Sequence, residues 1–164
     1  MPGSRKLPSR AELRTWREFI ETTEVLRGTL AARLQGDSGL SPGDYSVLLA
    51  LSEAEGGRIR SSELAARIGW ERSRVSHHLA RMERRQLIRR EECATDSRGA
   101  EVALEPAGAE AFHGATVPHL RAIRELFVDA LSPEQLAAAG EIAAALREHL
   151  SRPAPTRSPG RRGR

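Results

Sequence analysis

The chain has 164 residues and a formal net charge of +4; 39% of its residues are apolar, 29% are charged and 4% are aromatic. This length suits one compact domain or two small ones, and the few aromatic residues exclude an extended platform on which single strands or cofactor rings could stack. The single cysteine, Cys93, excludes an internal disulfide. No apolar run approaches the ~20 residues that cross a bilayer, and the N-terminal sequence MPGSRKLPSR lacks the apolar core of a signal peptide. We therefore expect a cytoplasmic protein without membrane contact.

Positive charge is concentrated in the middle of the chain. Residues 56–98 carry 11 Arg against 6 acidic residues, whereas 11–55 and 99–151 together carry 7 Arg against 16 acidic residues. The rest of the basic surplus lies near the two ends. A basic centre in an otherwise acidic body predicts that this centre contacts a polyanion.

Two helices are predicted at the start of the chain. Apolar residues recur at helical spacing from 11 to about 34, after a flexible segment over residues 1–10. Ser41 and Pro42 then have the N-cap and first-turn chemistry of a second helix over 43–55, which the next two glycines end.

A short helix and a longer one follow in the basic segment. After an extended piece over 58–60, Ser61 is the predicted N-cap of the helix SELAARI, and Gly69 supplies its left-handed end. A further helix begins near Glu71 and carries the arginine-rich sequence RSRVSHHLARMERR. Together they have the proportions of a helix-turn-helix, in which the second helix lies in the major groove of DNA.

The remaining sequence predicts a hairpin and two helices. LIRREEC and AEVAL, separated by ATDSRG, are predicted to be two strands joined by a turn, which would form a wing. Pro106 begins a long helix to about Leu131, and Ser132 caps a last helix that ends near Leu150. Residues 151–164 lack apolar periodicity and are predicted to be a disordered basic tail.

The arginine-rich helix has two different faces at about 100° per residue. Its apolar side is predicted to hold Val75, Leu79, Met82 and Gln86, with His78 at the edge. The opposite side is basic and has small residues between its long ones, as a surface that approaches base edges requires. The predicted DNA-contacting residues of this helix are Arg72, Ser73, Arg74, Ser76, His77, Arg81 and Arg84.

At these residues the chain resembles the MarR family of bacterial transcriptional regulators, which are winged-helix repressors and activators. The matching sequences are ELAARIGWERSRVSHHLARMERRQLIRR, TDSRG and VALEPAG, followed by a long helix. Asp96 and Arg98 match the Asp-x-Arg motif of the family's wing, and Leu104 to Gly108 matches its Leu-Thr-x-x-Gly motif, with Glu in place of Thr. Gln86 stands where the family usually has a glycine after the recognition helix.

The resemblance, over roughly residues 11–150, implies a mode of action. In the family, the first helix and the last two build a dimer interface, the wing arginine enters the minor groove, and a small ligand often binds between the interface and the DNA-reading lobe. For this chain, the resemblance implies a homodimeric repressor that binds double-stranded DNA and contacts it with Asp96 and Arg98. It also implies that a small-molecule effector, whose binding residues are unknown, releases the protein from the DNA.

The expected fold is mainly α with a small β-wing. A winged helix-turn-helix lobe over 38–105 would be flanked by N- and C-terminal dimerisation helices over 11–35 and 106–150. These long helices are more than a lobe of about 65 residues needs to bury itself, which favours a dimer interface. Two-fold symmetry would place the half-sites of a pseudo-palindromic operator ~34 Å apart.

Other interpretations fit less of the sequence. A winged helix can use the same face to bind an acidic protein, and competition by random duplex DNA would distinguish the two. An enzyme is disfavoured because no nucleophile elbow, phosphate loop or metal-ligand spacing is present. His77 and His78 point about 100° apart on a helix and cannot chelate one ion together, so we expect neither a metal nor a cofactor. Cys93 is interpreted as a half-buried strand residue.

Overall fold

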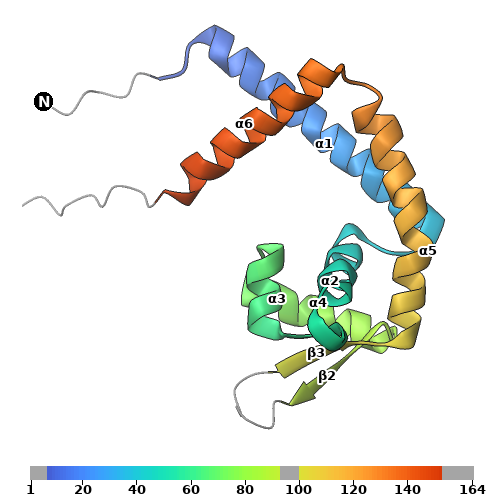
Figure 1. Ribbon diagram of the computed structural model, residues 1–164. Coiled ribbons are helices and arrows are strands. Elements are labelled where there is room, and N and C mark those ends of the chain that lie inside the picture. Colours follow the sequence, from blue (N-terminus) through green and yellow to red (C-terminus); the bar gives the residue numbers. More distant parts are fainter. Residues whose placement is uncertain (1–6, 93–99, 153–164) are drawn as a thin grey trace, which may run out of the picture. The chain divides into compact units, whose positions relative to one another are not determined.

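The computed structural model describes residues 7–92 and 100–152 and is mainly helical with one small sheet, as the sequence predicts (Figure 1). The chain divides into two compact units, Met1–Leu126 and Phe127–Arg164. Within the described ranges, every helix is too short or too polar to cross a membrane. The helices and strands are α1 (Arg10–Ser38), α2 (Pro42–Ser52), β1 (Arg58–Arg60), α3 (Ser61–Ile68), α4 (Arg72–Arg84), β2 (Ile88–Glu92), β3 (Ala100–Leu104), α5 (Pro106–Ile123) and α6 (Pro133–Ser151).

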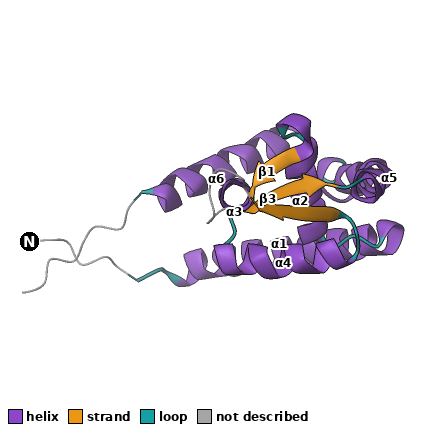
Figure 2. Cartoon of the chain, turned by 90° about the horizontal axis from the view of Figure 1, so that it is seen from below, coloured by secondary structure: helices purple, strands orange, loops and turns teal. Residues whose placement is uncertain are grey.

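The sheet has three antiparallel strands in the order β1-β3-β2 (Figure 2). Its central strand pairs Val102 with Ile59 of β1 on one side and with Arg90 of β2 on the other. The predicted hairpin is confirmed, and the extended piece at 58–60 joins it as a third strand. The sequence did not predict this pairing because a strand of three residues carries too little pattern to assign a partner.

A single hydrophobic core joins this sheet to α2, α3 and α4. Each of these elements contributes apolar side chains from one face only, as amphipathic elements do. Burial of one side of α4 leaves its opposite side toward solvent. The fully buried side chains include Leu48 and Leu51 of α2, Leu64 of α3, Val75, Leu79 and Met82 of α4, Ile88 of β2 and Val102 of β3.

Two helix ends differ from the prediction because turns intervene. α2 ends at Ser52 rather than near 55, since a 3-10 turn, Glu55–Gly57, occupies the glycines that were expected to end it. α5 ends at Ile123, where a π-helical turn, Arg124–Val128, replaces the last part of the predicted long helix. The first helix continues to Ser38, beyond the predicted end near 34, and Gly39, with φ 69°, is its C-cap.

The predicted serine caps have different outcomes. Ser132 caps α6 as predicted, since its side chain accepts a 3.2 Å hydrogen bond from the Gln135 backbone. Ser61 does not cap α3: the N-cap is Arg60, and no side chain caps this helix. The Ser61 hydroxyl instead donates a 2.8 Å hydrogen bond to the Ala100 carbonyl, which fastens α3 to β3.

Gln86 lies in the turn between α4 and β2, and its assignment to the apolar side of α4 is wrong. The helix ends at Arg84, and Gln86 is exposed with a left-handed φ of 59°. Left-handed backbone costs a residue with a Cβ about 1–2 kcal/mol, which glycine avoids. This geometry explains why a glycine suits this position.

Gly108 in the first turn of α5 is required by close packing. A Cβ at this position would lie 2.0 Å from the Leu87 carbonyl oxygen, which also accepts a 3.2 Å hydrogen bond from the Glu105 backbone. The start of α5 therefore rests directly on the backbone that joins α4 to β2. Only glycine leaves room for this contact, so Gly108 fixes where α5 leaves the lobe.

We predict that Gln86→Gly stabilises the fold. Relief of the left-handed strain exceeds the added entropy of a glycine in the unfolded chain, so the free energy of unfolding should rise by about 0.5–1 kcal/mol. Urea denaturation of both proteins measures this difference, with the exposed helical position Gln35→Gly, which should be destabilising, as the control. A lower stability of Gln86→Gly would contradict the strain at this turn.

Candidate nucleic-acid interface

The seven residues of α4 that the sequence singled out all lie at the surface. Their side chains are exposed, while Val75, Leu79 and Met82 are buried on the other side of the helix. His78 is also buried, as its place at the edge of the apolar side predicted. Asp96, Arg98 and Cys93 lie outside the described residues, as does the predicted tail from 153 onward.

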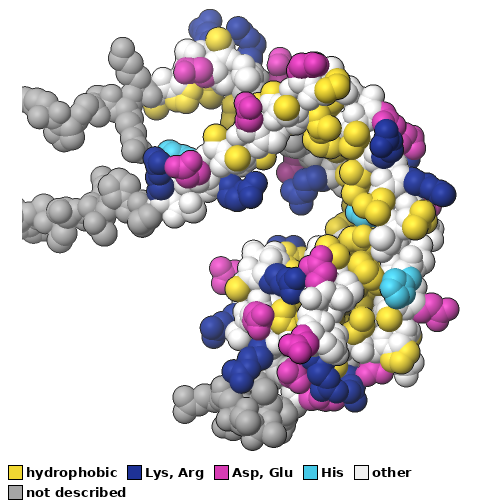
Figure 3. Space-filling view, viewed as in Figure 1, with side chains coloured by type: hydrophobic (Ala, Val, Ile, Leu, Met, Phe, Trp, Pro, Cys, Tyr) yellow, Lys and Arg dark blue, Asp and Glu magenta, His cyan; other side chains and the backbone are white. Residues whose placement is uncertain are grey.

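The arginines around α4 fall into two groups according to their partners. Arg90 of β2 donates two hydrogen bonds to the Glu83 carboxylate, at 2.8 and 2.6 Å. Arg89 contacts Glu91 at 2.9 Å and Glu105 at 3.0 Å. Other ion pairs join Arg58 to Glu91, Arg67 to Glu53 and Arg85 to Asp44. In Figure 3, blue basic and magenta acidic side chains accordingly lie intermixed over the lobe.

The second group keeps its charge uncompensated. Among the residues that the structure describes, no acidic side chain pairs with Arg72, Arg74, Arg81 or Arg84. Arg74, Arg81 and Arg84 lie on the outward side of α4, opposite its buried residues, and Arg72 is exposed in its first turn, so uncompensated positive charge of the basic segment is exposed along this helix. The sequence predicted the position of these residues but not this sorting, because ion-pair partners come from distant elements.

The start of α4 adds to this positive field. Its N-cap is Glu71, which makes no side-chain capping bond. The first N–H groups of a helix have no partner within the helix, and together with the helix dipole they favour an anion. The first turn carries Arg72, Ser73 and Arg74, so a phosphate at this end would meet both backbone and side-chain donors.

Two aromatic side chains, Trp70 and His78, contact two arginines on the outward side of α4. The Arg74 guanidinium lies 4.1 Å from the centroid of the Trp70 ring, a cation–π distance. Arg81 Nη2 donates a 2.8 Å hydrogen bond to His78 Nδ1. Trp70 and His78 contact each other edge to face, with 5.1 Å between ring centroids. Trp70 was not predicted from the sequence; the spacing of three between His78 and Arg81 was the available signal for the second contact.

Asp44 of α2 is the buried charge that joins this helix to α4. Its Oδ1 lies 3.0 Å from His78 Nε2, and its Oδ2 accepts a 2.7 Å hydrogen bond from Arg85. Ser41 and Asp44 also form the capping box of α2. Burial alone would raise the pKa of Asp44, but hydrogen bonds from His78, Arg85 and Ser41 outweigh burial and hold the pKa well below its ordinary value of 3.8.

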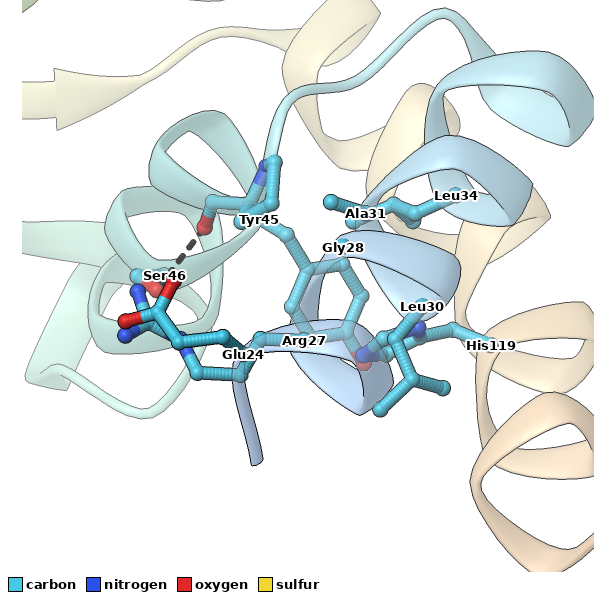
Figure 4. Close-up of a pocket in the computed structure, with 10 residues that line it drawn as sticks. Glu24, Arg27, Gly28, Leu30, Ala31, Leu34, Tyr45, Ser46 and His119 are labelled. Carbon is cyan, nitrogen blue, oxygen red and sulfur yellow. Dashed lines mark hydrogen bonds between the residues drawn. The ribbon is translucent and has the colours of Figure 1, made fainter. Parts of the chain in front are cut away.

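A cavity of about 430 Å³ lies between α1, α2 and α5 (Figure 4). Its walls are joined by a bidentate ion pair between Arg33 of α1 and Glu125, at 2.7 and 2.9 Å. The rings of Tyr45 and His119 line the cavity and lie next to each other, with 4.7 Å between centroids and their planes tilted by 59°. His119 Nδ1 is buried and has no hydrogen-bond partner among the described residues. Burial lowers the pKa of His119, which favours the neutral imidazole.

Metal or catalytic chemistry finds no support in the described ranges. No group of three or more His, Cys, Asp or Glu side chains there could hold a metal ion. His77 is exposed and His78 is buried, so the adjacent pair does not share one site. Glu91 is held by Arg58 and Arg89.

Comparisons with known proteins agree with this geometry. The chain matches the MarR family model over residues 38–99. AbsC, a MarR family transcriptional regulator from Streptomyces coelicolor, is 36% identical with a TM-score of 0.81, over 88% of this chain and 97% of AbsC. Sco3205 from the same organism, a MarR family transcriptional regulator solved in complex with DNA, is 34% identical with a TM-score of 0.83, over 93% and 94% of the two chains.

One more distant structure has the same fold. The organohalide-sensing regulator RdhR-CbdbA1625, in its 2,4-dichlorophenol-bound form, is 19% identical with a TM-score of 0.76, over 91% of this chain and 89% of that one. The comparison with curated proteins gave no match.

A helix-turn-helix that is followed by an antiparallel wing and presents unpaired arginines on its second helix defines a winged-helix protein. The chain belongs to the MarR family of transcriptional regulators. It is thus a DNA-binding regulator and not an enzyme, as the sequence predicted.

We predict that Asp44→Asn destabilises the fold at neutral pH, by roughly 1–3 kcal/mol, because it weakens a buried charge-assisted contact. A lowered carboxyl pKa contributes stability above the ordinary value of 3.8, and this contribution is lost as pH falls toward the folded-state pKa. The difference between the two proteins should therefore be constant near pH 7 and shrink below about pH 4.

Denaturant titrations at several pH values measure this difference, and Asp37→Asn, at an exposed position, is the matched control. A difference that stays unchanged down to pH 3 would show that the Asp44 carboxylate is not held in its charged form.

Proposed function

We propose that the chain is a homodimeric repressor that binds a pseudo-palindromic operator in double-stranded DNA through the outward side of α4. The distribution of ion pairs carries this proposal. Acidic groups neutralise Arg85, Arg89 and Arg90, whereas the arginines on the outward side keep their full charge. Phosphates gain most from charges that are not already compensated within the protein.

Specific contacts follow from the positions along α4. Ser73 and Arg74 at the N-terminal end would reach base edges, since the start of a recognition helix enters the major groove. Arg81 and His77 would face the same groove from the next turns, with Arg72, Ser76 and Arg84 toward the phosphates. Asp96 and Arg98 are proposed to contact the minor groove, on the strength of the wing motif alone.

Dimerisation is supported by apolar side chains that each unit leaves exposed. Trp16 on α1 is 61% exposed, and Leu120 on α5 is 56% exposed. In the second unit, Ile142 and Leu146 of α6 are about half exposed. Figure 3 shows hydrophobic side chains at the surface along α5. We propose that 11–35 and 106–150 form the dimer interface around the lobe at 38–105, since contiguous exposed apolar surface marks interaction sites.

The cavity between α1, α2 and α5 is the proposed effector site. Tyr45 and His119 offer aromatic surfaces to a molecule in the cavity. Arg27 at the rim would attract a negative charge. A small aromatic molecule with an acidic hydroxyl or carboxyl group fits this combination. Binding of this molecule would change the conformation at the start of α2, where Asp44 contacts α4. The protein would then release the DNA.

We predict that Arg74→Ala weakens binding to an operator, selected from a random library by the wild-type protein, by roughly 1–3 kcal/mol, because the variant cannot make a bidentate contact to guanine. Binding to random duplex should change much less. Fluorescence anisotropy at fixed salt measures both, with the exposed Arg121→Ala of α5 as the control. Equal losses on both DNAs would mean that Arg74 touches only phosphate, and binding that random duplex cannot compete would favour a protein-interaction module.

We predict that a small phenol lowers the operator affinity of the wild-type protein through the cavity. With 2,4-dichlorophenol as the probe, the ratio of affinities without and with the probe should fall toward one in His119→Phe, because the larger ring fills part of the cavity that His119 lines. His113→Phe, at an exposed position on the same helix, should keep the wild-type ratio. The same ratio in His119→Phe and wild type would place the effector elsewhere.

A further inference from the structure

Trp70, His78 and Gly43 form one packed cluster at the contact between α2 and α4. The two rings meet edge to face at 5.1 Å. A Cβ at Gly43 would lie 2.7 Å from Trp70 Cη2 and 2.8 Å from His78 Cε1. Both distances are below any normal contact, so the rings occupy the space that the missing side chain leaves. Both rings therefore pack directly against the backbone of α2 at Gly43.

Each ring of this cluster holds one arginine of the outward side of α4. Trp70 carries the Arg74 guanidinium on its face, at 4.1 Å from the ring centroid. His78 accepts the hydrogen bond of Arg81 at Nδ1. A guanidinium has five N–H donors, so Arg81 keeps most of its donors for another partner.

His78 is itself fixed from behind. A guanidinium can only donate, so Nδ1 is the accepting nitrogen of a neutral ring, and the ring proton is on Nε2, which lies 3.0 Å from Asp44 Oδ1. Asp44 is in turn fixed by the capping box with Ser41 and by Arg85. The chain of contacts Asp44–His78–Arg81 therefore runs from a buried carboxylate to the surface.

We propose that Trp70 and His78 are positioning residues for DNA recognition, which set the geometry of Arg74 and Arg81 without touching the DNA. The proposal rests on the proposed DNA contacts of these two arginines. An arginine held before binding loses less side-chain freedom when it meets its partner. Base recognition requires a fixed fork geometry, whereas attraction to phosphate does not. Removal of the ring contacts should therefore reduce specificity more than total affinity.

Two substitutions of His78 separate its two contacts. An asparagine amide places its polar atoms near Nδ1, and a glutamine amide places its polar atoms near Nε2. His78→Gln should keep the contact with Asp44 but release Arg81, and operator affinity should fall roughly three- to tenfold. His78→Asn should retain an acceptor for Arg81 and most of the operator affinity. His78→Asn is thus the matched control, because it changes the same position and retains the contact under test.

A double-mutant cycle with Arg81→Ala decides whether His78 acts through Arg81. The proposal predicts that His78→Gln costs less than about twofold in operator affinity once Arg81 is alanine. The same full loss in both backgrounds would show a purely structural role and overturn the proposal. If Arg81→Ala alone leaves operator affinity unchanged, the proposed DNA contact of Arg81 fails and the positioning role with it.

Gly43→Ala tests the cluster from the side of α2, far from the proposed contacts. The added methyl group must displace the rings, so the ratio of operator to random-duplex affinity should fall in this variant. Gly36→Ala, where a Cβ would meet no atom within 4 Å, should leave the ratio unchanged. Thermal unfolding of both variants checks that they are folded at the assay temperature. An unchanged ratio in folded Gly43→Ala would contradict the part of the proposal in which the packing of both rings against α2 sets their position.

Discussion

The buried carboxylate of Asp44 is the contact on which the arrangement of the lobe depends. It is 3% exposed, and taking a charge out of water is costly unless partners replace the lost hydration. Those partners are the backbone and hydroxyl of Ser41, His78 from the middle of α4 and Arg85 from its end. One carboxylate thus contacts the backbone at the start of α2 and two side chains, His78 of α4 and Arg85 at its end. These contacts fix the angle between the two helices. This contact therefore also sets the direction in which the outward side of α4 faces.

Ion pairing decides which part of a strongly basic segment is free to attract DNA. Arg58, Arg85, Arg89 and Arg90 each form an ion pair with an acid from another element, namely Glu91, Asp44, Glu105 and Glu83. The pairs that lie at the surface add little to stability, but they remove positive charge from much of the lobe surface. Within the described part of the chain, Arg74, Arg81 and Arg84 remain without acidic partners on one side of α4. We propose that a polyanion is thereby directed toward this side of the helix.

Much of the fold follows from local sequence patterns. Helical spacing of apolar residues predicts α1, α3 and α4, and a serine followed by proline predicts the starts of α2 and α6, because these signals act within one or two turns. The exposed side of α4 follows from the same period. Two failures share the opposite property: Ser61 binds a carbonyl of β3, and β1 is a strand only through its neighbour. The failure at Gln86 is local, because this residue takes the left-handed φ of the turn that closes α4, in which Leu87 N donates to the Met82 carbonyl.

The sequence predicts which residues of α4 form the candidate DNA-contacting surface, but it does not predict which side chains hold them in place. Helical phase could place Arg74 and Arg81 on the surface, but the tryptophan beneath one and the histidine beneath the other become visible only when α2, through Gly43 and Asp44, presses against α4. Long-range contacts of this kind leave no periodic signal in a single sequence.

The salt dependence of operator binding tests the central claim, that unpaired arginines on α4 provide the attraction to DNA. Two double variants carry equal changes in net charge: Arg72→Gln with Arg84→Gln removes unpaired charges, and Arg89→Gln with Arg90→Gln removes charges that acids already neutralise. In the first variant, the slope of log K against log salt should fall by about 0.9 for each phosphate that the protein no longer neutralises. In the second variant the slope should stay near the wild-type value. An equal fall in both variants would contradict the claim.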